Sequence, residues 1–172
     1  MDKKKGIKQA GISGEKAVAH QLKFLGSEYK ILNSKMICSG GSCQQFDHVV
    51  VGPNGIFHIE TKYWSGQIAF TETGIERDGG RGTKNDPTAQ MYRHEYILKE
   101  LVRENGLAGD VVGILCFAHP GCELIGSSPA FATVKLDRLV HFLKTHRAKK
   151  TLSDEEIRKI LRVIEANSKS AG

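Results

Sequence analysis

Two runs of β-branched and aromatic residues, Phe46 to Val51 and Ile56 to Lys62, flank the tetrapeptide Gly52-Pro53-Asn54-Gly55. Such runs favour β-strands, and Gly, Pro and Asn favour a tight turn between them. The segment therefore predicts an antiparallel hairpin, and any fold of this chain must contain a β-sheet. If the turn closes symmetrically, with Gly52 facing Gly55, Asp47 lies directly opposite Glu60 and their Cβ atoms are ~4.5–5.5 Å apart.

Lys62 follows Glu60 by two residues, which places both side chains on the same face of the strand. Two directly opposed carboxylates repel each other, and Lys62 can neutralise only one of them. A hard divalent cation such as Mg²⁺, which takes oxygen ligands, would neutralise the other. Lys62 could then orient a nucleophile or stabilise charge that develops on a phosphate.

Two alternatives to this metal site stay open. The three charged residues could form an ordinary cross-strand ion-pair cluster on a half-exposed sheet. A three-residue turn with Gly55 as a bulge would instead shift the register by one residue and move Glu60 to the other face.

The rest of the chain alternates helix and strand signals, which predicts a single α/β domain. Helices are predicted over residues 13–25 with Ser13 as N-cap, from Pro87 to Asn105, over 136–146, and over 154–167 with a capping box made by Ser153 and Glu156. Further strands are predicted over residues 29–33, 66–71, 111–117 and 131–134, and the segment 66–71 is expected to continue the meander of the hairpin. The domain spans residues 11–167 in this interpretation, with a flexible basic arm over 1–10 and a disordered tail over 168–172.

The charge balance favours an anionic partner, because 25 Lys and Arg against 19 Asp and Glu give a net charge of +6 and a pI near 9.2. No apolar stretch approaches the ~18–20 residues that span a bilayer, and no signal peptide is recognisable, so we expect a cytoplasmic protein without membrane contact. The four cysteines, Cys38, Cys43, Cys116 and Cys122, are then expected to be reduced thiols, and their spacing is poor for a zinc site.

Four blocks of residues, in order and in spacing, resemble the nuclease-related domain (NERD) family of the PD-(D/E)xK nuclease superfamily. They are Gly14-Glu15, the segment from Phe46 to Pro53 with Gly55 to Phe57, the segment Ile59 to Lys62 with Gly66, and the segment Pro87 to Gln90. The resemblance covers about residues 11–105 and implies a restriction-endonuclease-like fold, in which helices flank a mixed β-sheet.

Carried onto this sequence, the resemblance assigns roles to five side chains and one backbone carbonyl. It makes Asp47 and Glu60 metal ligands together with the backbone carbonyl of Thr61, and it makes Lys62 the catalytic lysine. Glu15 would be the acid of the first helix, and Gln90 a helix glutamine near the substrate or metal. The sequence departs from the family at Asp86, where Asn usually precedes Pro87, and at Gln45, where an acid is often found.

These inferences together predict a nuclease that depends on Mg²⁺ or Mn²⁺ and acts on nucleic acid, DNA rather than RNA. The alternative is a module that keeps the fold and binds nucleic acid without cleaving it. Arg77, Arg81 and Lys84, in a glycine-rich loop, could contact DNA phosphates or could simply be solvated. His58 could likewise touch metal or phosphate, although such a histidine is more often a structural neighbour.

Overall fold

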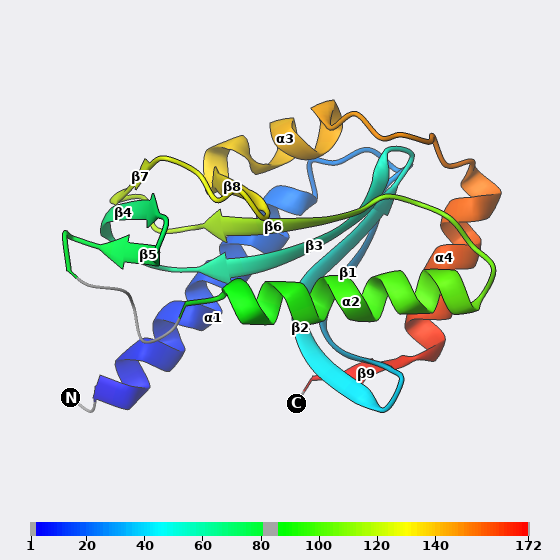
Figure 1. Ribbon diagram of the computed structural model, residues 1–172, viewed down its shortest axis with the longest axis horizontal. Helices are drawn as coiled ribbons and strands as arrows, with labels where there is room; N and C mark the ends of the chain where they lie inside the picture. The colour runs from blue at the N-terminus through cyan, green and yellow to red at the C-terminus, as the bar shows by residue number, and fades with distance from the viewer. Residues whose placement is uncertain (1–2, 81–85, 172) are drawn as a thin grey trace.

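The computed structural model describes residues 3–80 and 86–171, which form a mixed α/β fold with two sheets (Figure 1). The larger sheet has six strands in the order β8-β6-β3-β2-β1-β9, and the smaller has the order β5-β4-β7. The strands are β1 (Lys30–Ser39), β2 (Ser42–Gly52), β3 (Gly55–Lys62), β4 (Gly66–Thr71), β5 (Gly74–Arg77), β6 (Val111–Phe117), β7 (Cys122–Ile125), β8 (Ala132–Lys135) and β9 (Ser168–Ser170). The helices are α1 (Lys3–Leu22), α2 (Thr88–Glu104), α3 (Leu139–Thr145), which follows the short 3-10 turn η1 (Leu136–Arg138), and α4 (Asp154–Ala166). The predicted fold class, a mixed sheet flanked by helices, is confirmed.

The β2–β3 hairpin lies at the centre of the larger sheet and has the symmetric register that the turn predicts. Gly52 pairs with Gly55, and the ladder continues as far as His48 and Ile59. The turn itself is anchored, because the amide of Asn54 donates to the backbone carbonyl of Leu143 at 2.7 Å. The bulged alternative, which would have moved Glu60 to the other face, is therefore wrong.

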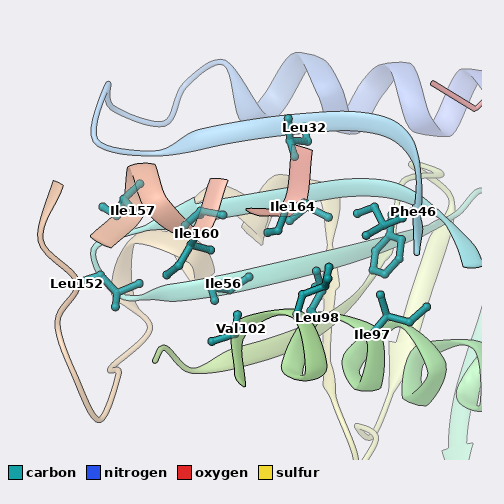
Figure 2. Packing of buried hydrophobic residues seen from close by; sticks show 14 residues of the cluster. Leu32, Phe46, Ile56, Ile97, Leu98, Val102, Leu152, Ile157, Ile160 and Ile164 are labelled. Atoms are coloured by element: carbon teal, nitrogen blue, oxygen red, sulfur yellow. The ribbon is translucent and has the colours of Figure 1, made fainter. Parts of the chain in front are cut away.

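Helices cover both faces of this sheet. On one face, α2 and α4 pack on β2 and β3. Figure 2 shows Val102 of α2 and Ile160 of α4 near Ile56 of β3, and Ile97 of α2 next to Phe46 of β2. On the other face, α1 and α3 bury the alternate residues of the same strands, such as Val50 and Phe57. β6 is the predicted apolar strand and pairs in parallel with β3, so that the carboxyl ends of β3 and β6 point the same way.

Several predicted element boundaries differ from the structure, most of all near the two ends of the chain. Ser13 does not cap a helix, because its hydroxyl donates to the carbonyl of Gln9 one turn earlier, inside a helix that begins at Lys3. Residues 3–10, expected in a flexible arm, are thus helical. Likewise β1 runs to Ser39, since its pairing with β2 extends from Lys30 to Ser39, interrupted only at Ser34. At the other end, residues 168–170, expected in a disordered tail, form β9 beside β1.

β4 has the predicted bounds but does not continue the meander. Gly66 has a φ of +87°, a conformation that suits glycine, and the chain turns there out of the large sheet. β4 then pairs with β5 and, in parallel, with β7. The chain therefore leaves the large sheet directly after Lys62 and builds a small second sheet beside it.

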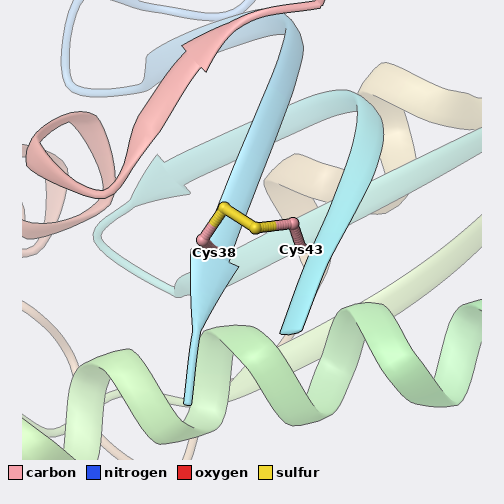
Figure 3. The surroundings of a disulfide bond; sticks show 2 residues. All are labelled: Cys38 and Cys43. Atoms are coloured by element: carbon pink, nitrogen blue, oxygen red, sulfur yellow. A yellow bond between two sulfur atoms is a disulfide. The ribbon is translucent and has the colours of Figure 1, made fainter. Parts of the chain in front are cut away.

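The expectation of four reduced cysteines is wrong for one pair. Cys38 and Cys43 form a disulfide between β1 and β2 (Figure 3), whereas Cys116 and Cys122 are free and buried. The β1–β2 register places Cys38 directly opposite Cys43, with a Cα–Cα distance of 4.1 Å, so the hairpin alone brings the two thiols together. Among the described helices, none is long and apolar enough to cross a membrane.

Candidate active site

The candidate site lies where β2 and β3 separate. Their backbone ladder ends at the pair His48 and Ile59. Asp47 is the next residue along β2, and its side chain takes over as partner: its Oδ2 accepts a hydrogen bond of 2.8 Å from the backbone N–H of Thr61, two residues beyond Ile59 on β3. The carboxylate is thus fixed at the fork between the two strands.

Glu60 lies on β3 next to this fork and is almost fully buried, with 4% of its surface exposed. The ammonium Nζ of Lys62 donates to its Oε1 at 2.7 Å, and the amide of Gln90, on α2, donates to its Oε2 at 3.0 Å. Both carboxylate oxygens therefore have a partner, one from the same strand and one from the helix that covers it.

Glu15 reaches the site because α1 packs very closely on β3. A Cβ atom added at Gly14 would lie 3.2 Å from both Thr61 Cγ2 and Tyr63 Cβ, which is tighter than normal side-chain packing. Glycine at this position lets the helix approach the strand. The next residue, Glu15, then lies close enough to Glu60 for their negative charges to interact. Burial raises the pKa of Glu15, the negative charge of Glu60 raises it further, and Lys62 lowers it.

The three carboxylates repel one another. Burial raises the pKa of Asp47 from 3.8 to about 7, the charge of Glu60 adds to this shift, the N–H of Thr61 opposes it, Glu15 again raises the pKa and Lys62 lowers it. One lysine thus faces three acids, of which Glu60 is buried and the other two are half-buried. Such a cluster is stable near neutral pH only if it takes up a proton or a cation.

The donor set fits a hard divalent cation. No group of three or more His, Cys, Asp or Glu side chains in residues 3–80 and 86–171 is already arranged as a metal site. Mg²⁺, however, usually takes only one or two carboxylates and completes its shell with water. Asp47 and Glu60 would supply those two carboxylates, and a cation there would offset the burial and the charge of Glu60 that raise the pKa of Asp47.

A family model described as "Nuclease-related domain" (NERD) matches residues 10–118, well over half of the chain. The chain belongs to the nuclease-related domain family. The match includes all five residues of the candidate site and ends just after β6, so that η1, α3, α4, β7, β8 and β9 lie outside it.

A curated relative of this nuclease-related domain is an uncharacterized protein of Bacillus anthracis, 29% identical over 128 residues. The aligned region is 71% of this chain and 58% of the relative. This chain therefore spans a little over half the length of that protein.

Next to Lys62, the nuclease-related domain has a cavity of about 360 Å³ whose walls include three residues that the sequence analysis had not assigned to the site: Trp64, Ala89 and Arg93. Simple spacing could have found Arg93, which follows Gln90 by three residues, about one helical turn. Trp64 lies beyond the end of β3, so the period of a strand does not predict where its side chain points. Asp86, the departure from the family pattern, also lines this cavity, and its Oδ1 accepts a hydrogen bond of 2.8 Å from the backbone N–H of Thr88, the first residue of α2.

The other residues predicted to contact DNA, metal or phosphate are Arg77, Arg81, Lys84 and His58. Arg77 is held at the end of β5 by the backbone carbonyl of Ser65, 2.9 Å from its Nε, and lies near Asp78. Arg81 and Lys84 lie outside the described residues, so their predicted contacts with DNA stay predictions. His58 is fully buried, with its ring edge-on to the stacked rings of Phe46 and His94, and burial lowers its pKa to about 3. His58 is therefore a neutral core residue.

Proposed function

We propose that this nuclease-related domain is a nuclease that requires Mg²⁺ or Mn²⁺ and hydrolyses phosphodiester bonds of nucleic acid, DNA rather than RNA. The observation that carries the proposal is the convergence of Asp47, Glu60 and Glu15 on Lys62 at the fork between β2 and β3. An ordinary surface ion-pair cluster does not require a buried acid beside two half-buried ones, nor a glycine that brings α1 against the strand.

Asp47, Glu60 and the backbone carbonyl of Thr61 would hold the cation. A bound Mg²⁺ or Mn²⁺ supplies a more acidic water molecule and positive charge next to the scissile phosphate. The protein holds the ligands in place beforehand: the Thr61 N–H fixes Asp47, and Gln90 fixes Glu60 from the opposite side. Such preorganisation means that little rearrangement is needed when charge develops.

Lys62 has the central role among the side chains. Its ammonium is within hydrogen-bond distance of Glu60 and lines the 360 Å³ cavity. A cation at this position can orient the attacking water and stabilise the extra negative charge on the phosphate oxygens. Arg93, on the wall of the same cavity, is placed to bind a neighbouring phosphate.

The net charge of +6 supports a polyanionic substrate. Affinity that depends on phosphate contacts should fall steeply as salt increases. We propose that Arg77, Arg81 and Lys84 add to these contacts, although Arg77 is already engaged by Ser65.

A plasmid-nicking assay tests the proposal. Supercoiled plasmid incubated with the protein and Mg²⁺ or Mn²⁺ should be nicked, and chelation of the metal should stop the reaction. Lys62→Ala should abolish nicking, whereas Lys159→Ala, which removes an exposed lysine from α4, should not. If the wild type retards DNA in a gel but never nicks it, the chain is a binding module instead.

A further inference from the structure

A second and larger cavity, of about 510 Å³, lies at the carboxyl ends of three neighbouring parallel strands. Its walls contain the residues that end or follow these strands: Tyr63 after β3, His119 two residues beyond β6, and Lys135 at the end of β8. In open α/β sheets, ligands bind in the crevice outside the carboxyl ends of the strands. The volume is also within the ~300–1,000 Å³ of small-molecule pockets.

Helix α1 closes the cavity from the side. Ser13, Ala17 and Gln21, which are four residues apart and so lie on one face of the helix, line this wall. Gly14 and Glu15 lie between Ser13 and Ala17 in the sequence. The helix that brings Glu15 to the candidate site, here called the catalytic cluster (Asp47, Glu60, Lys62, Glu15 and Gln90), therefore also forms a wall of this cavity. Tyr63 likewise follows Lys62 directly. The cavity and the catalytic cluster are therefore built from the same two elements.

The lining has the chemistry that recognises a nucleotide. The rings of Tyr63 and His119 lie 4.8 Å apart with an interplanar angle of 61°, and the backbone N–H of Gly121 donates to Nδ1 of His119 at 2.9 Å, which fixes that ring. Aromatic faces of this kind bind any base by stacking. Gln21 offers an amide to the edge of a base, and Lys135, which forms no ion pair within the described ranges, offers a cation to a phosphate.

We propose that this cavity receives the base of a nucleotide that is turned out of the stack close to the scissile phosphate. This inference rests on the proposed nuclease function and specifies its substrate: nucleic acid with an unpaired nucleotide, at an end, a gap or a single-stranded segment. Extrusion of a paired base costs unpairing energy, so a substrate whose base is already unpaired should be cleaved faster than intact duplex.

The first test is binding of free mononucleotides, dAMP and dTMP, in the absence of metal. The single tryptophan of the chain, Trp64, lies 5.9 Å from the ring of Phe117, which lines the cavity, and it also lines the 360 Å³ cavity. Its fluorescence therefore reports on nucleotide binding at either cavity, and a substitution in the 510 Å³ cavity assigns the signal. Ala17→Leu adds three carbon atoms on the cavity wall and should weaken binding roughly tenfold or more. Ala166→Leu makes the same substitution at an exposed site on α4 and is the matched control.

The second test compares the cleavage rates of single-stranded and duplex oligonucleotides of the same sequence. The wild type and Ala166→Leu should prefer the single strand, and Ala17→Leu should lose this preference. If Ala17→Leu does not fold, His119→Leu, which removes one of the two rings, takes its place in both tests.

The outcomes separate this inference from the nuclease proposal. A wild type that binds no mononucleotide, or binding and strand preference that Ala17→Leu and His119→Leu leave unchanged, would overturn the cavity's role even if plasmid is nicked. Mononucleotide binding that Ala17→Leu weakens, in a protein that never cleaves, would support the cavity as a nucleotide site and overturn only the nuclease.

Discussion

Asp47→Asn should make the metal-free protein more stable while it abolishes the proposed activity. The substitution keeps the size of the side chain and an oxygen that can accept the hydrogen bond from Thr61 N–H. It removes one of three mutually repelling carboxylates from a buried position. The free energy of unfolding in EDTA should therefore rise.

The size of the effect follows from the pKa of Asp47, which the folded protein raises from 3.8 to about 7. A raised pKa means that Asp47 binds its proton more tightly in the folded state than in the unfolded state. Above the raised pKa the charged carboxylate therefore lowers the free energy of unfolding by the full amount. This loss disappears as the pH falls toward 3.8, where Asp47 is also protonated in the unfolded state. At ~1.4 kcal/mol per unit, the penalty is at most about 4 kcal/mol near pH 8 and about 2 kcal/mol near pH 5. The stability gained by Asp47→Asn should shrink accordingly on acidification.

Urea denaturation in EDTA at both pH values, followed by circular dichroism, measures this difference. Asp137→Asn, at an exposed position on η1, is the matched control and should change stability by less than about 0.5 kcal/mol. Added Mg²⁺ should then stabilise the wild type by mass action and leave Asp47→Asn unaffected. A variant that is less stable than the wild type, by an amount independent of pH, would refute the argument that these acids repel one another.

Three further predictions concern the fold around the site. Burial lowers the pKa of His94 from 6.5 to about 4, so protonation of His94 should lower the free energy of unfolding by ~1.4 kcal/mol per pH unit as the pH falls from 6.5 toward 4. His94→Phe should remove this part of the pH dependence. Equal pH dependence in the wild type and the variant would contradict the burial argument. Reduction of the Cys38–Cys43 disulfide, with a sequence separation of 5, should lower the free energy of unfolding by about 2 kcal/mol, and identical urea curves with and without reductant would show otherwise. Gly14→Ala should push α1 from β3 and reduce plasmid nicking about tenfold with an unchanged circular dichroism spectrum, whereas Gly11→Ala, where an added Cβ meets nothing within 4 Å, should remain active; equal nicking by both variants would contradict the close-packing argument.

Local patterns predicted the parts of the fold that local interactions determine. The turn Gly52–Gly55 fixes the register of its own hairpin, and that register held as far as His48 and Ile59. The capping box of Ser153 and Glu156 is present for the same reason, since its two hydrogen bonds join residues three apart. By contrast, the edge strand β9 forms only because β1 lies beside it, and no pattern within residues 168–170 indicates that neighbour.

The disulfide was not predicted, although the pattern that indicates it lies within one short hairpin. Gly40 and Gly41 make a tight turn with positive φ at both residues, and the strands on either side pair Cys38 with Cys43. The count of cysteines in the whole chain argued for free thiols, but the hairpin holds this pair together whatever the count. The same register argument that located Asp47 and Glu60 would have located Cys38 and Cys43.

The candidate site divides in the same way. Asp47, Glu60 and Lys62 follow from one hairpin, whereas Glu15 and Gln90 come from helices whose docking no strand pattern predicts, so that only the family resemblance pointed to them.

The fork between β2 and β3 explains why these five residues meet. Where the ladder of β2 and β3 stops, the N–H of Thr61 loses its backbone partner and must be satisfied by another group. Asp47 provides that group, and in doing so it is drawn into the buried space beside Glu60, where its charge is costly. The end of strand pairing thus produces both the position of the carboxylate and the electrostatic strain that a cation would relieve.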